Sequence, residues 1–318
     1  MEQKLISIVT PCYNEQDNIR DVVQAVRGVF AELSGYRYEH LFIDNASTDR
    51  TVADLRELAA QDKHIKVIVN TRNFGHIRSG THGYLAAQGD AVIPLVADLQ
   101  TPPQLIKAFL EQWEAGYKIV VGVRKQTQGS FLLSWLAKFY YKVIGRLSDT
   151  RLVENFMGFG LFDRQVIELI RQMDDPYPYV RGLIAEIGYP TAEIEYVQPP
   201  RKKGKTKNNF YSLYDLAMLG ITNHSKVPLR LAAMMGFVFA IISLLVGLGY
   251  LVYKLIYWQW FSLGLAPVVI GLFFFASVQL FFLGIIGEYI GSIHTQVLRR
   301  PLVIEKERIN FEAHGDEG

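Results

Sequence analysis

Cysteine is almost absent from this sequence, and charge is nearly balanced. The single cysteine, Cys12, excludes an internal disulfide and indicates a reducing compartment. The formal net charge is +2, so there is no global electrostatic case for a nucleic-acid partner. The apolar stretch Leu5–Val9 is too short for a signal peptide and leads into a polar turn. We therefore expect the N-terminal part to stay on the cytoplasmic side.

Long uncharged runs dominate the C-terminal third. Leu231–Tyr253 carries no charged residue and is long enough to span a bilayer. Leu255–Gly287 is also uncharged, and its second part, from Leu263 onward, predicts another span behind an aromatic turn. Runs of this length are not typical of a buried helical pair in a soluble protein. The sequence predicts an integral membrane protein with two spans.

Positive charges flank these spans. Lys226 and Arg230 precede the first span, Arg299 and Arg300 follow the second, and only Lys254 lies in the connection. The positive-inside rule then predicts that both termini and the N-terminal domain are cytoplasmic, with a short external hairpin. Small residues repeat at one-turn spacing in Gly236-x-x-x-Ala240 and Gly287-x-x-x-Gly291. They permit close packing within the hairpin or between subunits of a homo-oligomer, and the sequence does not choose.

The first two-thirds alternate between short β-branched runs and amphipathic stretches. This alternation predicts an α/β fold, a doubly wound and mostly parallel sheet with helices on both faces. The expected strands are Leu5–Thr10, Tyr38–Ile43, Ile65–Asn70, Ala91–Val96, Lys118–Val123 and Glu193–Val197. The expected helices are Glu15–Leu33, Thr51–Ala60, His76–Ala87, Gln104–Ala115 and a helix capped by Asp163 that runs through Met173.

Polar residues follow four successive strands. Asp98 and Gln100 end the central strand, just before Pro102 and Pro103. In open α/β sheets ligands bind beyond the carboxyl ends of strands, and a carboxylate with an amide suits a hard cation that accompanies phosphates. Asp44 follows the second strand and can accept hydrogen bonds from a base or ribose. The alternative role for Asp98, and for the pair formed by Ser47 and Asp49, is helix capping.

Four motifs together resemble the inverting family 2 glycosyltransferases, in the branch that makes polyprenyl-phosphate sugars. The branch includes dolichol-phosphate mannose synthases and bacterial undecaprenyl-phosphate glycosyltransferases, among them two-span bactoprenol glucosyltransferases. The motifs are Pro11-Cys12-Tyr13-Asn14-Glu15, Asp44-x-x-Ser47-Thr48-Asp49, Arg72-Asn73-Phe74-Gly75 and Ala97-Asp98-Leu99-Gln100-x-Pro102-Pro103. The segment Gly287-Glu288-Tyr289-Ile290-Gly291 adds a fifth point of likeness, to the two-span members.

The resemblance implies a GT-A-like fold, a nucleotide-sugar donor, Mg²⁺ or Mn²⁺, and a polyprenyl phosphate acceptor. Asp98 and Gln100 would hold the metal, and Asp98 and Arg201 are counted as the catalytic residues. The donor would contact Pro11, Tyr13, Asn14, Glu15, Asp44, Ser47, Asn73, Ala97, Asp98 and Lys207.

Two departures from the family pattern concern the chemistry. Val96 stands where the family usually has the first Asp of Asp-x-Asp, so the metal site has one carboxylate fewer. Gly158 stands where many relatives carry an Asp that is proposed to touch the sugar or act as a base. A lipid monophosphate has a second pKa of about 6, so this nucleophile needs positioning more than deprotonation. Glu154 and Asn155 remain candidates for sugar contacts.

Two amphipathic stretches and a basic loop connect the domain to the membrane. Ser130–Leu147 combines an apolar stripe with lysines and an arginine, which favours an interfacial helix over packing on the core, and Asn208–Thr222 predicts a second one. The loop Arg201-x-x-Gly204-x-Thr206-Lys207 carries five cations in seven residues. It is a positive-inside flank, a clamp for phosphates, or both, with Arg201 as the bidentate ligand and Lys205 and Thr206 as acceptor contacts.

We therefore expect a cytoplasmic glycosyltransferase domain at residues 1–200 and a basic juxtamembrane segment at 201–228. Two transmembrane helices at 229–292 and a cytoplasmic tail at 293–318 complete the chain, with Glu305 opening a strand. The expected reaction moves a sugar, from UDP-glucose or a similar UDP-hexose, to undecaprenyl phosphate with inversion. The alternatives are a catalytically degenerate membrane subunit that binds nucleotide, and a polysaccharide synthase, which normally has more spans.

Overall fold

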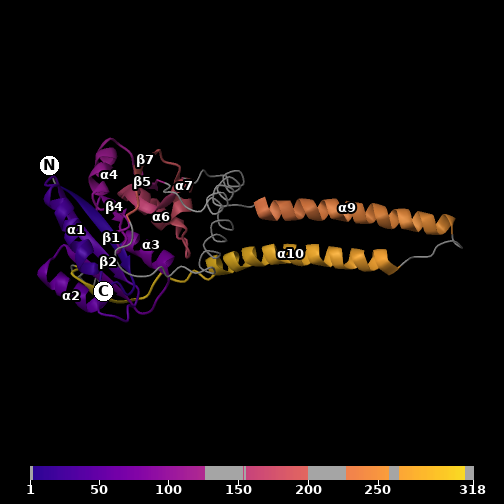
Figure 1. Cartoon of the computed structure of the whole chain (residues 1–318), viewed down its shortest axis with the longest axis horizontal. Helices are drawn as coiled ribbons and strands as arrows, with labels where there is room; N and C mark the ends of the chain where they lie inside the picture. Colours follow the sequence, from indigo (N-terminus) through magenta and orange to yellow (C-terminus); the bar gives the residue numbers. More distant parts are fainter. Residues whose placement is uncertain (1–2, 126–152, 154, 200–226, 258–264, 312–318) are drawn as a thin grey trace, which may run out of the picture.

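The computed structural model describes residues 3–125, 153, 155–199, 227–257 and 265–311 (Figure 1). Its strands are β1 (Lys4–Cys12), β2 (Tyr36–Asp44), β3 (Ile65–Asn70), β4 (Ala91–Pro94), β5 (Ile119–Arg124), β6 (Phe156–Asp163), β7 (Thr191–Tyr196) and β8 (Glu305–Ile309). Its helices are α1 (Ile19–Ala31), α2 (Thr51–Gln61), α3 (His76–Ala86), α4 (Leu105–Glu114), α6 (Arg164–Met173), α7 (Val180–Ile187), α9 (Val227–Ile256) and α10 (Leu265–Val297).

The strands form one mixed sheet in the order β7-β5-β6-β4-β1-β2-β3-β8. The central strands β4, β1, β2 and β3 are parallel, and β7 is parallel to β5. Strand β6 runs antiparallel to both of its neighbours, and β8 runs antiparallel to β3. The predicted α/β class is confirmed, and the antiparallel strands flank the parallel centre that ends in the polar motifs.

Helices cover both faces of the sheet, as a doubly wound fold requires. One apolar cluster joins the sheet to α1, α2 and α4, through side chains such as Val22, Leu55 and Phe109. The other joins the opposite face to α3, α6 and α7, through side chains such as Ile167 and Leu183. Both clusters consist largely of β-branched and aromatic residues from strands that alternate between the two faces.

One glycine lets α3 lie close to the sheet. A Cβ on Gly83 would come within 2.7 Å of Val9 Cγ1 and 2.9 Å of Ile43 Cγ1. Contacts this short are excluded by sterics, so a larger residue there would push α3 away from β1 and β2. The close packing sets the position of the start of α3, which lies beside the polar ends of the strands.

Two of the predicted boundaries that differ from the structure lie at the polar loops. The helix predicted from Glu15 begins at Ile19, because the Glu15 carbonyl accepts hydrogen bonds from the backbone of Asn18 and Ile19 in a tight turn. The strand predicted through Val96 ends at Pro94, since the chain then turns and the Val96 amide donates to Thr101 Oγ1 at 3.3 Å. In both places, residues that the local sequence pattern assigns to a helix or a strand belong instead to the polar loop beside it.

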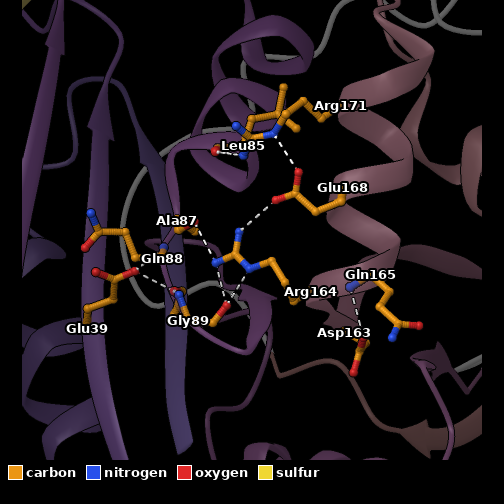
Figure 2. A network of polar contacts seen from close by, with 11 residues as sticks. Glu39, Leu85, Ala87, Gln88, Gly89, Asp163, Arg164, Gln165, Glu168 and Arg171 are labelled. Carbon is orange, nitrogen blue, oxygen red and sulfur yellow. Dashed lines mark hydrogen bonds and ion pairs between the residues drawn. The ribbon is translucent and has the colours of Figure 1, made fainter.

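An arginine network attaches α6 to the loop between α3 and β4 (Figure 2). Arg164 Nη2 donates to the Ala87 carbonyl at 2.8 Å, and Arg164 Nε donates to the Gly89 carbonyl at 2.9 Å. Asp163 caps the same helix through the Gln165 amide at 2.9 Å, as predicted. The start of α6 is thereby held against the loop that leads into the central strand.

The two C-terminal helices are long, apolar and exposed over nearly all of their length. The candidate spans are Val227–Ile256 and Ile270–Val297. The most apolar stretch of each has a mean hydropathy of 2.5 and 2.2, respectively, and is 0% buried. A core helix of a soluble protein would be mostly buried, and a signal sequence would lie near the N-terminus. Helices α9 and α10 extend side by side away from the sheet domain (Figure 1), as a two-span hairpin does.

The chain returns to the sheet after α10. Strand β8 pairs with β3, with Val67 opposite Ile309, and the Thr71 amide donates to the Ile304 carbonyl at 2.9 Å. His82 Nε2 lies 2.5 Å from Glu305 Oε1, and Arg56 pairs with Glu307. The expected strand at Glu305 therefore exists, and it is the edge strand of the same sheet that begins at the N-terminus.

Candidate functional site

The polar motifs meet at the carboxyl ends of β4, β1, β2 and β3. These strands are parallel neighbours, and the register sets Cys12 opposite Asp44. The loops that follow β1 and β2 therefore begin side by side, while the loop after β4 lies on the other side of β1. This arrangement brings seven of the predicted donor residues together: Pro11, Tyr13, Asn14, Glu15, Asp44, Ser47 and Asn73.

Hydrogen bonds join the loop after β1 to the loop after β2. The Asn14 amide donates to Ser47 Oγ at 2.9 Å, and the Thr48 amide donates to Asn14 Oδ1 at 2.8 Å. The Glu15 amide donates to Thr51 Oγ1 at 2.9 Å. Both backbones are thus held by side chains of the other loop, which makes the pair of loops a rigid surface.

Asp49, and not Ser47, bonds the start of α2, although the N-cap residue of that helix is Arg50. Asp49 Oδ1 accepts from the amide of Thr51, the first residue of α2, at 2.9 Å. Ser47 instead bonds the Asn14 amide, and its own amide donates to Asp44 Oδ2 at 2.9 Å. Ser47 therefore belongs to the site surface, and Asp49 serves the start of a helix.

Asp44 is a buried carboxylate at the floor of this surface. Its side chain is 0% exposed, and burial raises its pKa above the ordinary value, although hydrogen bonds from Ser47 oppose that rise. The buried Cys12 thiol lies 4.0 Å from Asp44 Oδ1, and burial together with this carboxylate raises the thiol pKa. A carboxylate with few solvent contacts is suited to accept a hydrogen bond from a ligand.

Asn45 was missed by the sequence reasoning, although it lies inside a quoted motif. Its Oδ1 accepts from the Phe74 amide at 2.9 Å, and its Nδ2 donates to Asn73 Oδ1 at 2.9 Å. Asn73 Oδ1 also accepts from the Gly75 amide at 2.8 Å. Asn45 therefore fixes the loop after β3, and the only available signal was its place directly after Asp44.

The central strand ends in a tight turn around Asp98. Asp98 is 9% exposed, and its Oδ1 accepts from the Gln100 amide at 3.1 Å. Ala97 is buried, and Gln100 is half-buried. Val96 is 42% exposed, so its side chain points away from the core at the position of the missing carboxylate.

The described residues fit a cation only with help from a ligand. Among them, no group of three or more His, Cys, Asp and Glu side chains is placed to hold a metal ion. Asp98 and Gln100 supply hard oxygen donors, which are the donors that Mg²⁺ and Mn²⁺ prefer. Mg²⁺ usually binds through one or two carboxylates together with substrate phosphates, and that mode fits this donor set.

Three non-glycine residues have left-handed backbones directly at this edge. The φ angles are 55° at Asn14, 62° at Ala46 and 56° at Leu99, one in each loop after β1, β2 and β4. Asn tolerates this region, but Ala and Leu adopt it at a cost of about 1 kcal/mol each. Such strain gathers where a site demands a particular backbone, which supports a binding role for all three loops.

Strand β6 brings a fourth segment to the same edge. It runs antiparallel to β4, so its first residues lie beyond the end of β4, near the Asp98 turn. Asn155 precedes β6 with φ of 58°, and its carbonyl accepts from the Arg124 amide at 3.2 Å. Gly158 also has a positive φ of 95°, a backbone that an aspartate would adopt only under strain.

Several predicted residues lie outside the described part of the chain. These are Glu154, Arg201, Lys205, Thr206 and Lys207, together with the helices expected at Ser130–Leu147 and Asn208–Thr222. Their predicted roles in sugar, phosphate and membrane contact stay predictions.

Comparison with known proteins gives consistent matches over nearly the whole chain. A model of "Glycosyl transferase family 2" matches residues 7–171. An uncharacterised glycosyltransferase of Synechocystis sp. is 35% identical over 300 residues, which cover 94% of each chain. A prophage-derived bactoprenol glucosyl transferase of Shigella flexneri is 34% identical over 304 residues, 95% of this chain and 97% of that protein.

Solved structures resemble the chain less closely. A glucosyl-3-phosphoglycerate synthase from Mycobacterium tuberculosis, in complex with Mn²⁺, UDP and phosphoglyceric acid, covers 69% of this chain and 76% of its own. The two share a TM-score of 0.49 and 16% sequence identity. A likeness at this level adds nothing to the sequence matches.

Proposed function

The chain belongs to glycosyl transferase family 2, and on this premise we propose that it transfers a sugar from a nucleotide diphosphate to a polyprenyl phosphate. One observation carries the proposal. The sheet whose strand ends form the site rich in oxygen acceptors also contains β8, the strand that follows the two exposed apolar helices. Relatives named bactoprenol glucosyl transferases match 95% of this chain, which supports a polyprenyl carrier.

The donor, which we propose is UDP-glucose or a similar UDP-hexose, would lie on the two joined loops. Asp44 accepts a hydrogen bond from the base or ribose, and Tyr13 lies half-buried in the adjacent loop. The bonds between Asn14, Ser47 and Thr48 hold both loops before the donor arrives. Binding then orders few protein groups, and preorganisation of this kind raises affinity.

The diphosphate would lie toward the Asp98 turn. Asp98 and Gln100 would hold Mg²⁺ or Mn²⁺, which supplies positive charge to the departing diphosphate. The turn presents the Asp98 carboxylate rigidly, because one of its oxygens is bonded to the Gln100 amide. From the sequence, Arg201 and Lys207 are the cations proposed to bind phosphates, and Arg201 is suited to a bidentate contact.

The acceptor phosphate is its own nucleophile. Its second pKa is about 6, so it is largely ionised at neutral pH and needs no protein base. A phosphate oxygen attacks the anomeric carbon from the face opposite the diphosphate, and the configuration inverts as the carbon–oxygen bond to the donor breaks. The residues of the chain orient the two substrates and exclude water, and this positioning lowers the barrier.

Transfer of labelled sugar tests the proposal. Purified protein would receive UDP-[¹⁴C]glucose and undecaprenyl phosphate, with Mg²⁺, with Mn²⁺ or with EDTA. We expect chloroform-extractable label that depends on the cation and falls at least a hundredfold in Asp98→Ala. Asp21→Ala, which removes an exposed carboxylate from α1, is the matched control and should keep full activity.

Three other results have definite meanings. UDP binding without transfer, over a panel of nucleotide sugars, would establish the degenerate binding subunit, which the loss of a carboxylate at Val96 favours. Label that grows into a polymer would establish a polysaccharide synthase. Undiminished transfer by Asp98→Ala would remove the assigned metal site.

We also propose that the sheet domain and both termini are cytoplasmic, because Arg230, Arg299 and Arg300 flank the candidate spans on the domain side. Single cysteines test this orientation in spheroplasts of a Cys12→Ala protein. An impermeant maleimide should label Tyr257→Cys in intact spheroplasts, and Arg37→Cys only after lysis. The reverse pattern would refute the orientation.

A further inference from the structure

Three arginines from distant parts of the chain meet where the membrane hairpin joins the sheet domain. Arg72 follows β3, Arg78 lies in α3, and Arg300 follows α10. The guanidinium carbons of Arg72 and Arg78 lie 4.0 and 5.6 Å from the centre of the Phe74 ring. Arg78 Nη2 donates to the carbonyl of Pro301, the neighbour of Arg300. We call these three residues the arginine cluster.

The cluster carries positive charge without a compensating carboxylate. None of the ion pairs between described residues involves Arg72, Arg78 or Arg300 at distances up to 4.0 Å. Burial, with the charges of Arg72 and Arg300, lowers the pKa of Arg78. Its Nε–H is buried and bonds no described group. The buried Nε–H without a hydrogen-bond acceptor and the repulsion from the neighbouring arginines both cost stability in the free protein. A bound anion would accept a hydrogen bond and offset the repulsion.

The location of the cluster selects the kind of anion. Arg300 lies three residues beyond the end of α10, at the depth expected for lipid headgroups. Arg72 is followed by Asn73, which bonds Asn45 in the loop after β2, so the cluster also adjoins the candidate site. In Figure 1 the end of α10 faces the right-hand side of the sheet domain, from which the two helices extend.

A cavity of about 160 Å³ opens beside the cluster, between α3, α6 and the segment that follows α10. Arg299 and Arg300 line one side of this cavity, and Asp174 and Asp175 line another. The carboxylates would repel an anion inside the cavity. The open face of the cluster, toward Arg72 and Phe74, is therefore the favourable place for a negatively charged group.

We propose that Arg72, Arg78 and Arg300 bind the phosphate group of a membrane lipid. The shared chemistry is a phosphate oxyanion at the headgroup level, held by guanidinium groups that match its geometry. The positive-inside rule explains Arg300 by itself, but it does not explain Arg72 and Arg78, which come from the sheet domain. The source is either the acceptor monophosphate, a reading that rests on the proposed function, or a phospholipid phosphodiester.

Binding to the full-length protein in nanodiscs separates the two sources. Wild type, Arg78→Gln and Arg300→Gln would be placed in phosphatidylcholine discs that contain undecaprenyl phosphate, phosphatidylglycerol or neither. Retention of each lipid would be measured by mass spectrometry after delipidation. Arg37→Gln is the matched control, because Arg37 is an exposed arginine at the start of β2, at the opposite end of that strand from the candidate site. UDP affinity, measured separately, reports whether each variant folds and whether the donor site is intact.

If the cluster holds the acceptor, both cluster variants should retain undecaprenyl phosphate about tenfold less well, while phosphatidylglycerol retention and UDP affinity stay unchanged. If it holds a phospholipid, the loss should affect phosphatidylglycerol instead. Either result supports the proposal. Equal retention of both lipids by Arg300→Gln and wild type would overturn it, since Arg300 is exposed and its replacement does not threaten folding. None of these outcomes depends on sugar transfer.

Discussion

At the carboxyl edge of the sheet, some residues adopt strained backbone conformations that lower stability and fix the geometry of the loops. Ala46 and Leu99 hold left-handed backbones at φ of 62° and 56°. In the same turns, the Ser47 amide donates a hydrogen bond to Asp44 Oδ2, and the Gln100 amide donates one to Asp98 Oδ1. Each strained residue therefore lies next to a bond that orients a carboxylate. Two predictions follow from these carboxylates and from the position where one is missing.

The first prediction concerns Val96. Its side chain is 42% exposed, so Val96→Asp adds a carboxylate near Asp98 without burying a charge. A second carboxylate should strengthen cation binding. We expect the Mn²⁺ concentration for half-maximal transfer to fall about fivefold or more, and Val96→Asn should give a smaller change. An unaltered or raised requirement for Mn²⁺ would show that residue 96 does not face the cation.

The second prediction concerns the buried Asp44. Because burial raises its folded pKa, the folded protein binds this proton more tightly than the unfolded chain does, and ionisation costs stability as pH rises through the folded pKa. Asp44→Asn removes that cost. The melting temperature without ligand should rise at pH 7, and the gain over wild type should shrink toward pH 4.

The same substitution should weaken UDP binding about tenfold, because a charged acceptor is lost. Asp21→Asn, at an exposed site on α1, should change neither quantity. A stability gain that grows as the pH falls would contradict the assigned cause.

Elements reach their positions through a few polar attachments rather than through the apolar core alone. Arg164 links α6 to the carbonyls of Ala87 and Gly89, and Trp113 Nε1 of α4 donates to Asp163 Oδ2 at 2.8 Å. One turn of chain at the end of β6 is therefore tied to helices on both faces of the sheet. These bonds set where β4 begins, and so where the Asp98 turn that follows its end at Pro94 lies.

Arg164→Ala should therefore destabilise the domain. It leaves two carbonyls without their charged donor, and we expect a loss of about 2 kcal/mol, or roughly 4–8 °C in melting temperature. Arg171→Ala is the matched control, since Arg171 is half exposed and bonds a single carbonyl, that of Leu85 at 2.7 Å, beside an exposed ion pair with Glu168 at 3.2 Å. Thermal unfolding of both variants in the same detergent tests whether Arg164→Ala lowers the melting temperature more than Arg171→Ala does. Equal losses would mean that the network in Figure 2 is not centred on Arg164.

At the scale of the whole molecule, β8 couples the apolar hairpin of α9 and α10 to the sheet. The chain leaves the domain before α9 and returns after α10 to pair with β3, so both connections lie at the same end of the hairpin. Asn310 Nδ2 adds bonds to the carbonyls of Ala59 and Ile65, at 2.6 and 2.9 Å. Because β1 and β8 share one sheet, they lie on the same side of any membrane that α9 and α10 cross, which agrees with the proposed two-span topology.

Removal of β8 should loosen the domain. Truncation after Ile304 exposes the edge of β3 and deletes the ion pairs of Glu305 and Glu307. We expect the melting temperature to fall by more than about 5 °C and aggregation to increase, because an open edge strand pairs with other chains. Truncation after Phe311 keeps the strand and serves as the control. Identical melting curves for the two truncated proteins would mean that β8 contributes nothing to stability.

Sequence by itself determined the features that depend on local period and composition. The Asp163 cap, the strand-end motifs, the two apolar helices long enough to span a membrane and most of the alternation of strands and helices were predicted, because the period of buried residues can be read from neighbouring positions. Strand β6 and helix α7 were not predicted. The boundaries near Glu15 and Val96 were wrong because side chains of another loop, or of a later turn, compete for the backbone there. Local patterns do not contain such partners.

Only the tertiary structure decided the features that join distant residues. It separated Ser47 from Asp49, since the partner of Ser47 is Asn14, thirty-three positions away. It also gave β8 its place beside β3, and it brought Arg78 to Pro301 across 223 positions. Hydrogen bonds and charges act over a few ångströms in space, whatever the separation along the chain. The shape of the site and its link to the two apolar helices therefore became visible only when the sheet was assembled.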